Sequence, residues 1–170
     1  MVTVVTIYFV TIKVPDMPLP QSGFRLDHFI PYRLMVAAEK VSLGFSVTYK
    51  KQYGLNRPEW RVLASLAQLG KATAKDIGVH SSMHKTKVSR AVFELERRKW
   101  LTRSADENDR RVEHLALTKA GVAVHGKLAV QAERYQQDIL ARLGSGKGGQ
   151  LIDVLDRLDV LFSGQDTNQP

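Results

Sequence analysis

Apolar residues recur at helical intervals near both ends of the chain, which predicts long helices there. One helix is expected from Leu26 to about Gln52, and another from Lys119 to about Leu143. The glycine-rich segment 144–149 is interpreted as a flexible link to a last helix at about 150–162. The apolar positions of that last helix are spaced by three and four: Leu151, Val154, Leu155, Leu158 and Leu161. So much apolar helix surface favours burial against a second copy of the chain.

Three shorter helices are predicted between these ends. Asn56 and Pro58 mark the start of the first, which is expected to stop at Gly70. Its apolar face holds Trp60, Leu63, Leu66 and Leu69. Thr73 and Asp76 have the spacing of a capping box, which opens a second helix ending near Gly78. After a tight turn, the third helix runs from about residue 83 to 99 and is expected to bury Val88, Ala91, Val92 and Leu95.

A β-hairpin is predicted after the third helix. Residues 101–104 and 110–117 have strand character, and the polar residues 105–109 between them are typical of a turn. Three helices followed by such a hairpin form a winged helix-turn-helix unit, in which the hairpin is the wing. The predicted fold is therefore mainly α with a small β-hairpin wing, an α+β arrangement.

The first 25 residues are interpreted separately from the fold. Residues 1–10 are apolar and β-branched, but they lack the basic start of a signal peptide and are too short to span a membrane. Pro15, Pro18 and Pro20 separate them from the first predicted helix. The segment is a short strand, an arm that binds a partner, or sequence upstream of a true start at Met17; the last two are favoured equally. Residues 164–170 are expected to form a frayed tail.

Three stretches of sequence resemble the MarR (multiple antibiotic resistance regulator) family of winged helix-turn-helix regulators, over about residues 26–163. Residues 58–63 resemble the family's second helix, and residues 88–96 with 100–103 resemble its recognition helix and first wing strand. The most specific stretch is the Asp-x-x-Asp-Arg-Arg turn at 106–111, followed by the Leu-Thr-x-x-Gly helix start at 117–121. The resemblance implies a triangular homodimer, joined through the helices at 26–54 and 119–163, with a DNA-binding lobe at 55–118.

The resemblance also implies a function. Members of the family are transcriptional regulators that bind near-palindromic operators in double-stranded DNA, and many release the DNA when a small aromatic acid binds. A repressor controlled by such an effector is therefore expected. The alternative is a winged-helix module that binds DNA or protein without control by a small molecule.

The DNA-binding residues are expected on the recognition helix and on the wing. The face of the third helix opposite its core presents Lys85, Thr86, Lys87, Ser89 and Arg90, of which Arg90 is suited to a forked contact with guanine. On the wing, Arg110 and Arg111 follow Asp106 and Asp109. One Asp is expected to accept an Arg fork and fix the loop, which leaves the other Arg for the minor groove. A plain solvated polar face is the competing interpretation of both elements.

An effector pocket is expected between the first two helices. His28, Tyr32 and Trp60 are its predicted lining, and Arg33 is available to pair with a carboxylate. A core position is the favoured interpretation of Trp60, and a dimer contact is the alternative for Tyr32.

Charge and composition agree with a nucleic-acid partner and give no sign of an enzyme. The chain has 25 Lys and Arg against 17 Asp and Glu, a net charge of +8, and the excess is confined to residues 1–119. It has no Cys, so disulfides, Cys-based zinc sites and regulation by Cys oxidation are excluded. No catalytic residue, metal site or cofactor is expected. The glycine-rich segment 144–149 lacks the spacing of a P-loop. A cytoplasmic protein without membrane association is predicted.

Overall fold

A computed structural model of the chain describes residues 23–109 and 111–162, and these divide after Ala38 into two units that are described separately. The first unit contains a short 3-10 helix, η1 (Leu26–His28), and the start of helix α1 (Ile30–Tyr53). Pro31 lies in the first turn of α1, where its missing N–H is not needed, as the sequence predicted. The predictions for most of the arm at 1–25, and for the tail at 164–170, lie outside the described residues.

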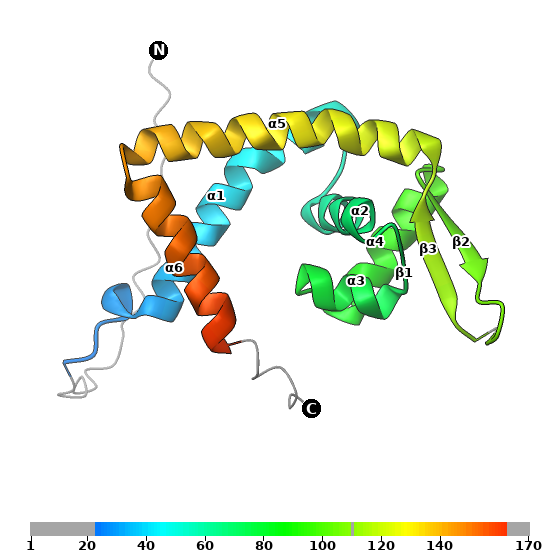
Figure 1. The fold of residues 1–170 in the computed structure, drawn as a ribbon, viewed down its shortest axis with the longest axis horizontal. Helices are drawn as coiled ribbons and strands as arrows, with labels where there is room; N and C mark the ends of the chain where they lie inside the picture. The colour runs from blue at the N-terminus through cyan, green and yellow to red at the C-terminus, as the bar shows by residue number, and fades with distance from the viewer. Residues whose placement is uncertain (1–22, 110, 163–170) are drawn as a thin grey trace, which may run out of the picture. The chain divides into compact units, whose positions relative to one another are not determined.

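The second unit, from Glu39 onward, contains the rest of α1 and a winged helix-turn-helix lobe (Figure 1). Its other elements are α2 (Arg57–Leu69), β1 (Lys71–Ala72), α3 (Ala74–Ser81), α4 (Lys85–Arg97), β2 (Leu101–Ala105), β3 (Glu113–Leu117), α5 (Lys119–Leu143) and α6 (Lys147–Phe162). The small sheet and the three short helices gather at the start of α5, and α6 folds back from the other end of α5. The predicted fold class, mainly α with a small β wing, is confirmed.

Side-chain caps begin the helices where the sequence placed them. Asn56 and Glu59 form a reciprocal capping box at the start of α2, and Thr73 and Asp76 form another at the start of α3. The hydrogen bonds from Thr73 lower the pKa of the Asp76 carboxyl. Thr118 caps α5 by accepting from the backbone N–H of Gly121. These local contacts fix the boundaries between the elements of the lobe.

The sheet has three antiparallel strands in the order β1-β3-β2. The predicted hairpin is β2 and β3, paired from Leu101 opposite Leu117 to Ala105 opposite Glu113. Strand β1 was not predicted, because two residues are too few to show an alternating pattern. It pairs with the open edge of β3 and so ties the α2–α3 connection to the wing.

The core of the lobe lies between α2, α4 and the sheet. The predicted inner face of α4, Val88, Ala91, Val92 and Leu95, is buried as expected. The predicted face of α2 is wrong at one position: Leu69 is 40% exposed, and Val62 is buried instead. Val62 lies next to Leu63 and one turn before Leu66, so the buried stripe of α2 runs through these three residues.

Several helix boundaries differ from the predictions. The helix predicted from Leu26 begins at Ile30, after the separate 3-10 helix η1. Helix α3 continues past Gly78 to Ser81, and α4 begins at Lys85 because Ser82 adopts a left-handed conformation with φ of 50° between them. Helix α6 begins at Lys147, inside the segment predicted as a flexible link. Gly148 is buried against Leu140, so this part of the glycine-rich segment allows close helix packing.

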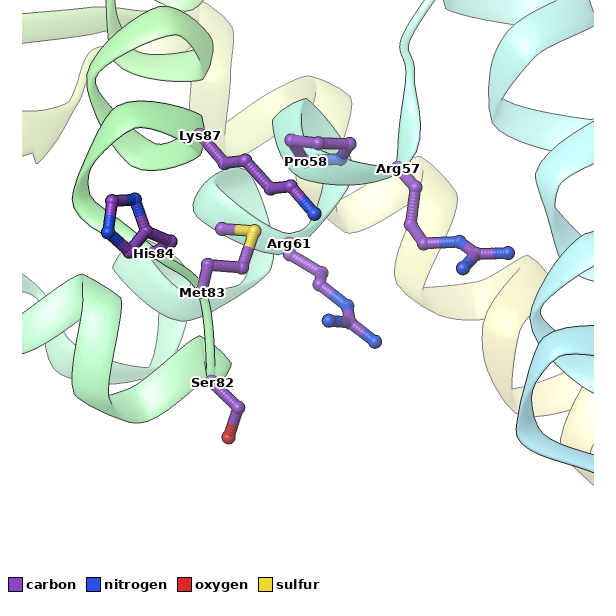
Figure 2. A pocket seen from close by; sticks show the side chains of 7 residues that line it. All are labelled: Arg57, Pro58, Arg61, Ser82, Met83, His84 and Lys87. Atoms are coloured by element: carbon purple, nitrogen blue, oxygen red, sulfur yellow. The ribbon is translucent and has the colours of Figure 1, made fainter. Parts of the chain in front are cut away.

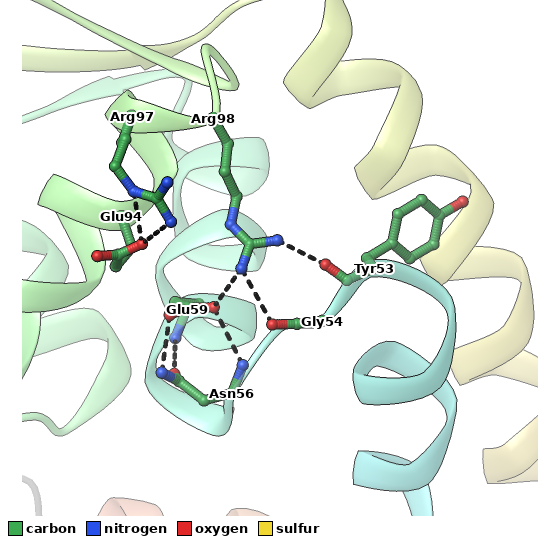
Figure 3. Close-up of polar contacts among 7 residues, drawn as sticks. All are labelled: Tyr53, Gly54, Asn56, Glu59, Glu94, Arg97 and Arg98. Atoms are coloured by element: carbon green, nitrogen blue, oxygen red, sulfur yellow. Dashed lines mark hydrogen bonds and ion pairs between the residues drawn. The ribbon is translucent and has the colours of Figure 1, made fainter.

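A buried ionic contact holds the end of α4 to the loop between α1 and α2 (Figure 3). The guanidinium of Arg98 donates to the backbone carbonyls of Tyr53 (2.6 Å) and Gly54 (3.0 Å) and lies 3.8 Å from the carboxylate of Glu59. Glu59 is only 4% exposed, and it also accepts from the backbone N–H and side chain of Asn56. The recognition helix is thereby anchored at its C-terminal end.

Candidate nucleic-acid interface

The N-terminal half of α4 presents an exposed polar face. The five residues predicted to contact DNA on this helix are all exposed: Lys85, Thr86, Lys87, Ser89 and Arg90. Thr86, Ser89 and Arg90 lie opposite the buried face, because residues three and four apart share one face of an α-helix, and Lys85 and Lys87 flank them. The structure therefore brings these five predicted residues together on one surface.

The basic groups on this face are not neutralised by neighbouring acids. Among the described residues, no ion pair includes Lys85, Lys87 or Arg90. About two turns after Arg90, Arg97 pairs with Glu94 at 2.8 Å and contributes less net charge. The free positive charge of α4 is thus concentrated near its N-terminus, the end that enters the major groove in helix-turn-helix proteins.

The neighbouring helices fix the position of α4. Helices α2 and α3 both pack against it, and the turn before it is held by the backbone bond from Met83 N–H to the Gly78 carbonyl (2.9 Å). His84 is the N-cap residue, and its Nδ1 accepts from the backbone N–H of Thr86 at 3.4 Å. The exposed face is therefore carried on a rigid element with a defined start.

Asp106 fixes the loop of the wing. Its carboxylate accepts from the backbone N–H groups of Asn108 (2.9 Å) and Asp109 (3.1 Å) and contacts Nε2 of His114 at 2.8 Å. These contacts, that with His114 above all, hold the pKa of Asp106 down at about 2. Among the described residues the loop is fixed by backbone amides and a histidine, where the sequence analysis expected an arginine fork.

Only one of the two arginines predicted on the wing lies within the described residues. Arg111 is exposed, and its backbone N–H donates to the Asp109 carboxylate, while Arg110 lies outside the described residues. A third arginine, Arg103, is held in the hairpin between Glu96 (2.9 Å) and Glu113 (2.8 Å). Arg103 therefore braces the wing against the end of α4, and Arg111 remains available to a partner.

The predicted effector residues are divided between the two units. His28, Tyr32 and Arg33 belong to the first unit, and Trp60 belongs to the second. Trp60 is half-buried in an aromatic cluster, where its ring stacks on His125 and lies 5.5 Å from Phe45, centroid to centroid. Burial lowers the pKa of His125 in this cluster. Trp60 thus has the packing of a core residue, the interpretation that the sequence analysis favoured.

A pocket that the sequence analysis missed lies between the starts of α2 and α4 (Figure 2). It has a volume of about 340 Å³, and its lining includes Arg57, Arg61, His84 and Lys87. Arg57 and Arg61 are four residues apart on α2, so the sequence already placed them on one helix face. They come close to α4 only in the folded chain. Helical periodicity in the sequence does not show which helices pack together.

The described residues show no metal cluster and no membrane-spanning segment. No group of three His, Asp or Glu side chains within residues 23–109 and 111–162 is arranged to hold a metal ion. None of the helices in these ranges combines the length and the apolar character that crossing a bilayer requires.

Comparison with known proteins gives one consistent family. The model of the MarR family matches residues 55–112, which span α2 to the wing loop. A curated relative, the homoprotocatechuate degradative operon repressor of Escherichia coli, is 21% identical over 136 residues, covering 80% of this chain and 92% of the relative.

Solved structures show the same fold. The crystal structure of a MarR family transcriptional regulator from Silicibacter pomeroyi DSS-3 is 29% identical, with a TM-score of 0.67, and the match covers 80% of this chain and 99% of that one. BpsR of Bordetella bronchiseptica, whose DNA binding is regulated by 6-hydroxynicotinic acid, is 21% identical with a TM-score of 0.71. That match covers 80% of this chain and 96% of BpsR.

Proposed function

Because the chain belongs to the MarR family, we propose that it is a homodimeric transcriptional repressor that binds a near-palindromic operator in double-stranded DNA and is released by a small aromatic acid. Its matched relatives are transcriptional regulators. In this role the protein has no catalytic residue and no cofactor, and it acts in the cytoplasm, where a bacterial chromosome lies.

The observation that carries this proposal is the unneutralised basic face at the start of α4. Lys85, Lys87 and Arg90 have no acidic partner among the described residues. In the major groove, Arg90 is suited to donate two hydrogen bonds to guanine O6 and N7, and Thr86 to contact a base or a thymine methyl. Ser89 and the two lysines then position the helix through phosphates.

The wing supplies the second contact in the proposal. Arg111 follows a loop that Asp106 holds in place, and Arg110 is proposed as a second contact. A narrow A·T-rich minor groove has an enhanced negative potential that attracts arginine. The wing is therefore proposed to read the flanks of the operator, while α4 reads its centre.

Apolar residues left exposed on α6 support the homodimer. Within the single chain, Leu151 is 40% exposed, Leu155 is 44% exposed, and Leu161 is 70% exposed. Burying an aliphatic side chain of this kind contributes about 1.5–3 kcal/mol. The helices at 26–54 and 119–163 are accordingly proposed to form the dimer interface, and residues 55–118 the DNA-binding lobe.

The effector is proposed to be an aromatic acid. His28, Tyr32, Arg33 and Trp60 remain the proposed contacts for its ring and carboxylate, and Trp60 is the weakest of these because of its packing in the aromatic cluster. The relatives give the chemical class its support: one represses a homoprotocatechuate degradative operon, and another responds to 6-hydroxynicotinic acid.

Fluorescence anisotropy with a duplex from the promoter of the protein's own gene tests the proposal. We expect binding at least about 10³-fold tighter than to a scrambled duplex at physiological salt. Equal binding to both duplexes would contradict a sequence-specific regulator. Homoprotocatechuate and 6-hydroxynicotinate then serve as probes of control: release of the DNA by either supports an effector-controlled repressor, and the alternative of a module without such control predicts no release by any aromatic acid.

A further inference from the structure

The pocket between α2 and α4 is built from three separate parts of the lobe (Figure 2). Arg57 and Arg61 come from the start of α2, Met83 from the turn, and His84 and Lys87 from the start of α4. Lys87 extends from α4 toward α2, and Arg61 extends outward from α2. The volume of about 340 Å³ is enough for a phosphate group or a small carboxylic acid.

The lining of the pocket is positively charged and contains no carboxylate. Arg57 is already paired, since its guanidinium donates to both oxygens of Glu39 at 2.7 and 2.8 Å. Arg61 makes a long contact of 3.5 Å with the Ser81 carbonyl, and Lys87 has no ion pair among the described residues. Beside the cavity, neither Arg61 nor Lys87 is in an ion pair among the described residues, although Glu39, the partner of Arg57, also attracts Arg61 electrostatically.

The remaining polar groups of the pocket also favour an anion. His84 accepts through Nδ1 from Thr86, so in the neutral ring the proton lies on Nε2, which is left as a donor. The N-terminus of α4 adds the positive end of its helix dipole. Basic side chains of α2 and α4 thus lie around one space, and none of the residues that line it is acidic.

We propose that this pocket is an oxyanion site that takes a phosphate or carboxylate group beside Lys87, and that a free anion bound there competes with the operator for this lysine. The proposal rests on the DNA-binding function proposed above, because Lys87 belongs both to the pocket and to the exposed face of α4. The anion has two sources, a phosphate of the operator backbone or the acid group of a small effector. In either case Arg61 holds the anion without itself lying on the recognition helix.

The experiment compares wild type with Arg61→Gln and with the matched control Lys127→Gln on α5, which removes one exposed cation outside the pocket. Inorganic phosphate and benzoate are titrated as probes into each folded protein, with NMR amide shifts as the readout. DNA binding is then measured by anisotropy in chloride and in each probe anion at equal ionic strength. Thermal melting verifies that each variant is folded.

A small-acid site predicts that phosphate or benzoate binds wild type and moves the amide signals of residues 82–87. Binding should weaken at least fivefold in Arg61→Gln and not in Lys127→Gln. At equal ionic strength the probe anion should weaken DNA binding at least threefold in wild type and much less in Arg61→Gln.

A backbone-phosphate site predicts a different pattern, with no binding of free anions. Arg61→Gln should then lose DNA affinity and reduce the log–log salt slope by about 1 per pocket, while Lys127→Gln should not. If Arg61→Gln changes neither anion binding nor DNA binding while wild type still selects its promoter, the pocket is not an oxyanion site, although the proposed function stands. If wild type does not prefer its promoter duplex to the scrambled one, the proposed function is wrong. If an anion binds the pocket without weakening DNA binding, the proposed competition with the operator is wrong.

Discussion

Two glycines of α5 differ in whether the folded lobe leaves room for a Cβ atom. A Cβ added at Gly121 would collide with the backbone carbonyl of Trp100, whereas one added at Gly126, in the same helix, would meet nothing within 4 Å. Trp100 and Gly121 thus set the closest approach of α5 to the start of the wing. A strict requirement for glycine at residue 121 follows from packing and not from backbone conformation.

We predict opposite effects of alanine at these two positions. Gly121→Ala should lower the free energy of unfolding by about 1–3 kcal/mol, because backbone has to shift to admit the methyl group. Gly126→Ala should raise it by about 0.5–1 kcal/mol, because alanine restricts the unfolded chain and favours the helix. Urea denaturation followed by circular dichroism measures both, and equal effects in the two variants would show that the contact with Trp100 is unimportant.

The wing loop should respond to acid through Asp106. Its pKa is lowered to about 2 from the ordinary 3.8, so the folded loop favours the charged carboxylate. Its contribution to stability is therefore fully present above about pH 3.8 and is lost as the pH falls from there through about 2. A carbon-13 NMR titration of the Asp106 carboxyl should give a midpoint near 2; a midpoint close to 3.8 would mean that His114 and the loop amides do not hold it.

At the scale of elements, we expect substitutions in the recognition helix and in the wing to weaken DNA binding in different ways. Arg90→Ala should weaken the free energy of binding to the cognate site by about 1–3 kcal/mol. It should also reduce the base preference at one position in each half-site. Arg111→Ala should weaken binding to all sequences and lose selectivity mainly at A·T-rich flanks. Anisotropy with a set of duplexes that differ by single base pairs separates the two patterns. If Arg90→Ala weakens every duplex equally, Arg90 is a phosphate contact, and Thr86 or Lys87 is the better candidate for reading bases.

Elements with local signals were predictable from the sequence, and elements that depend on tertiary contacts were not. The caps at Asn56 and Thr73 and the inner face of α4 were identified because each depends on residues within one or two turns of each other. Strand β1 exists only because the edge of β3 is open to it. The start of α6 at Lys147 depends on the packing of Gly148 against Leu140. The glycine-rich sequence gives no signal of this packing.

The candidate site also has one part that the sequence predicted and another part that it did not. The five exposed residues of α4 followed from helical periodicity, because the opposite face is apolar. The oxyanion pocket was missed because Arg61 and Lys87 are 26 positions apart and meet only when α4 packs on α2. The partner of Asp106 was also not predicted, since His114 reaches it across the hairpin.

At the scale of the whole molecule, the proposed dimer follows from apolar surface that the single chain leaves uncovered. Sedimentation equilibrium at micromolar concentration should give twice the mass of the chain. Leu155→Asp should shift the protein toward the monomer, because Leu155 is 44% exposed in the single chain and a charge there opposes burial in a partner. Lys75→Asp, on the exposed face of α3, is the control and should remain a dimer. A wild-type monomer with full helicity would contradict the proposal.

The central claim is that two copies of α4 read a symmetric DNA sequence, and selection from random duplex DNA with the wild-type protein tests it most directly. The account predicts an enriched near-palindrome whose half-sites lie about one helical turn apart, roughly 34–36 Å between centres, with A·T-rich flanks where the wings dock. If the selection enriches no symmetric motif, the basic face of α4 is a general polyanion surface, and the protein is not a sequence-specific regulator.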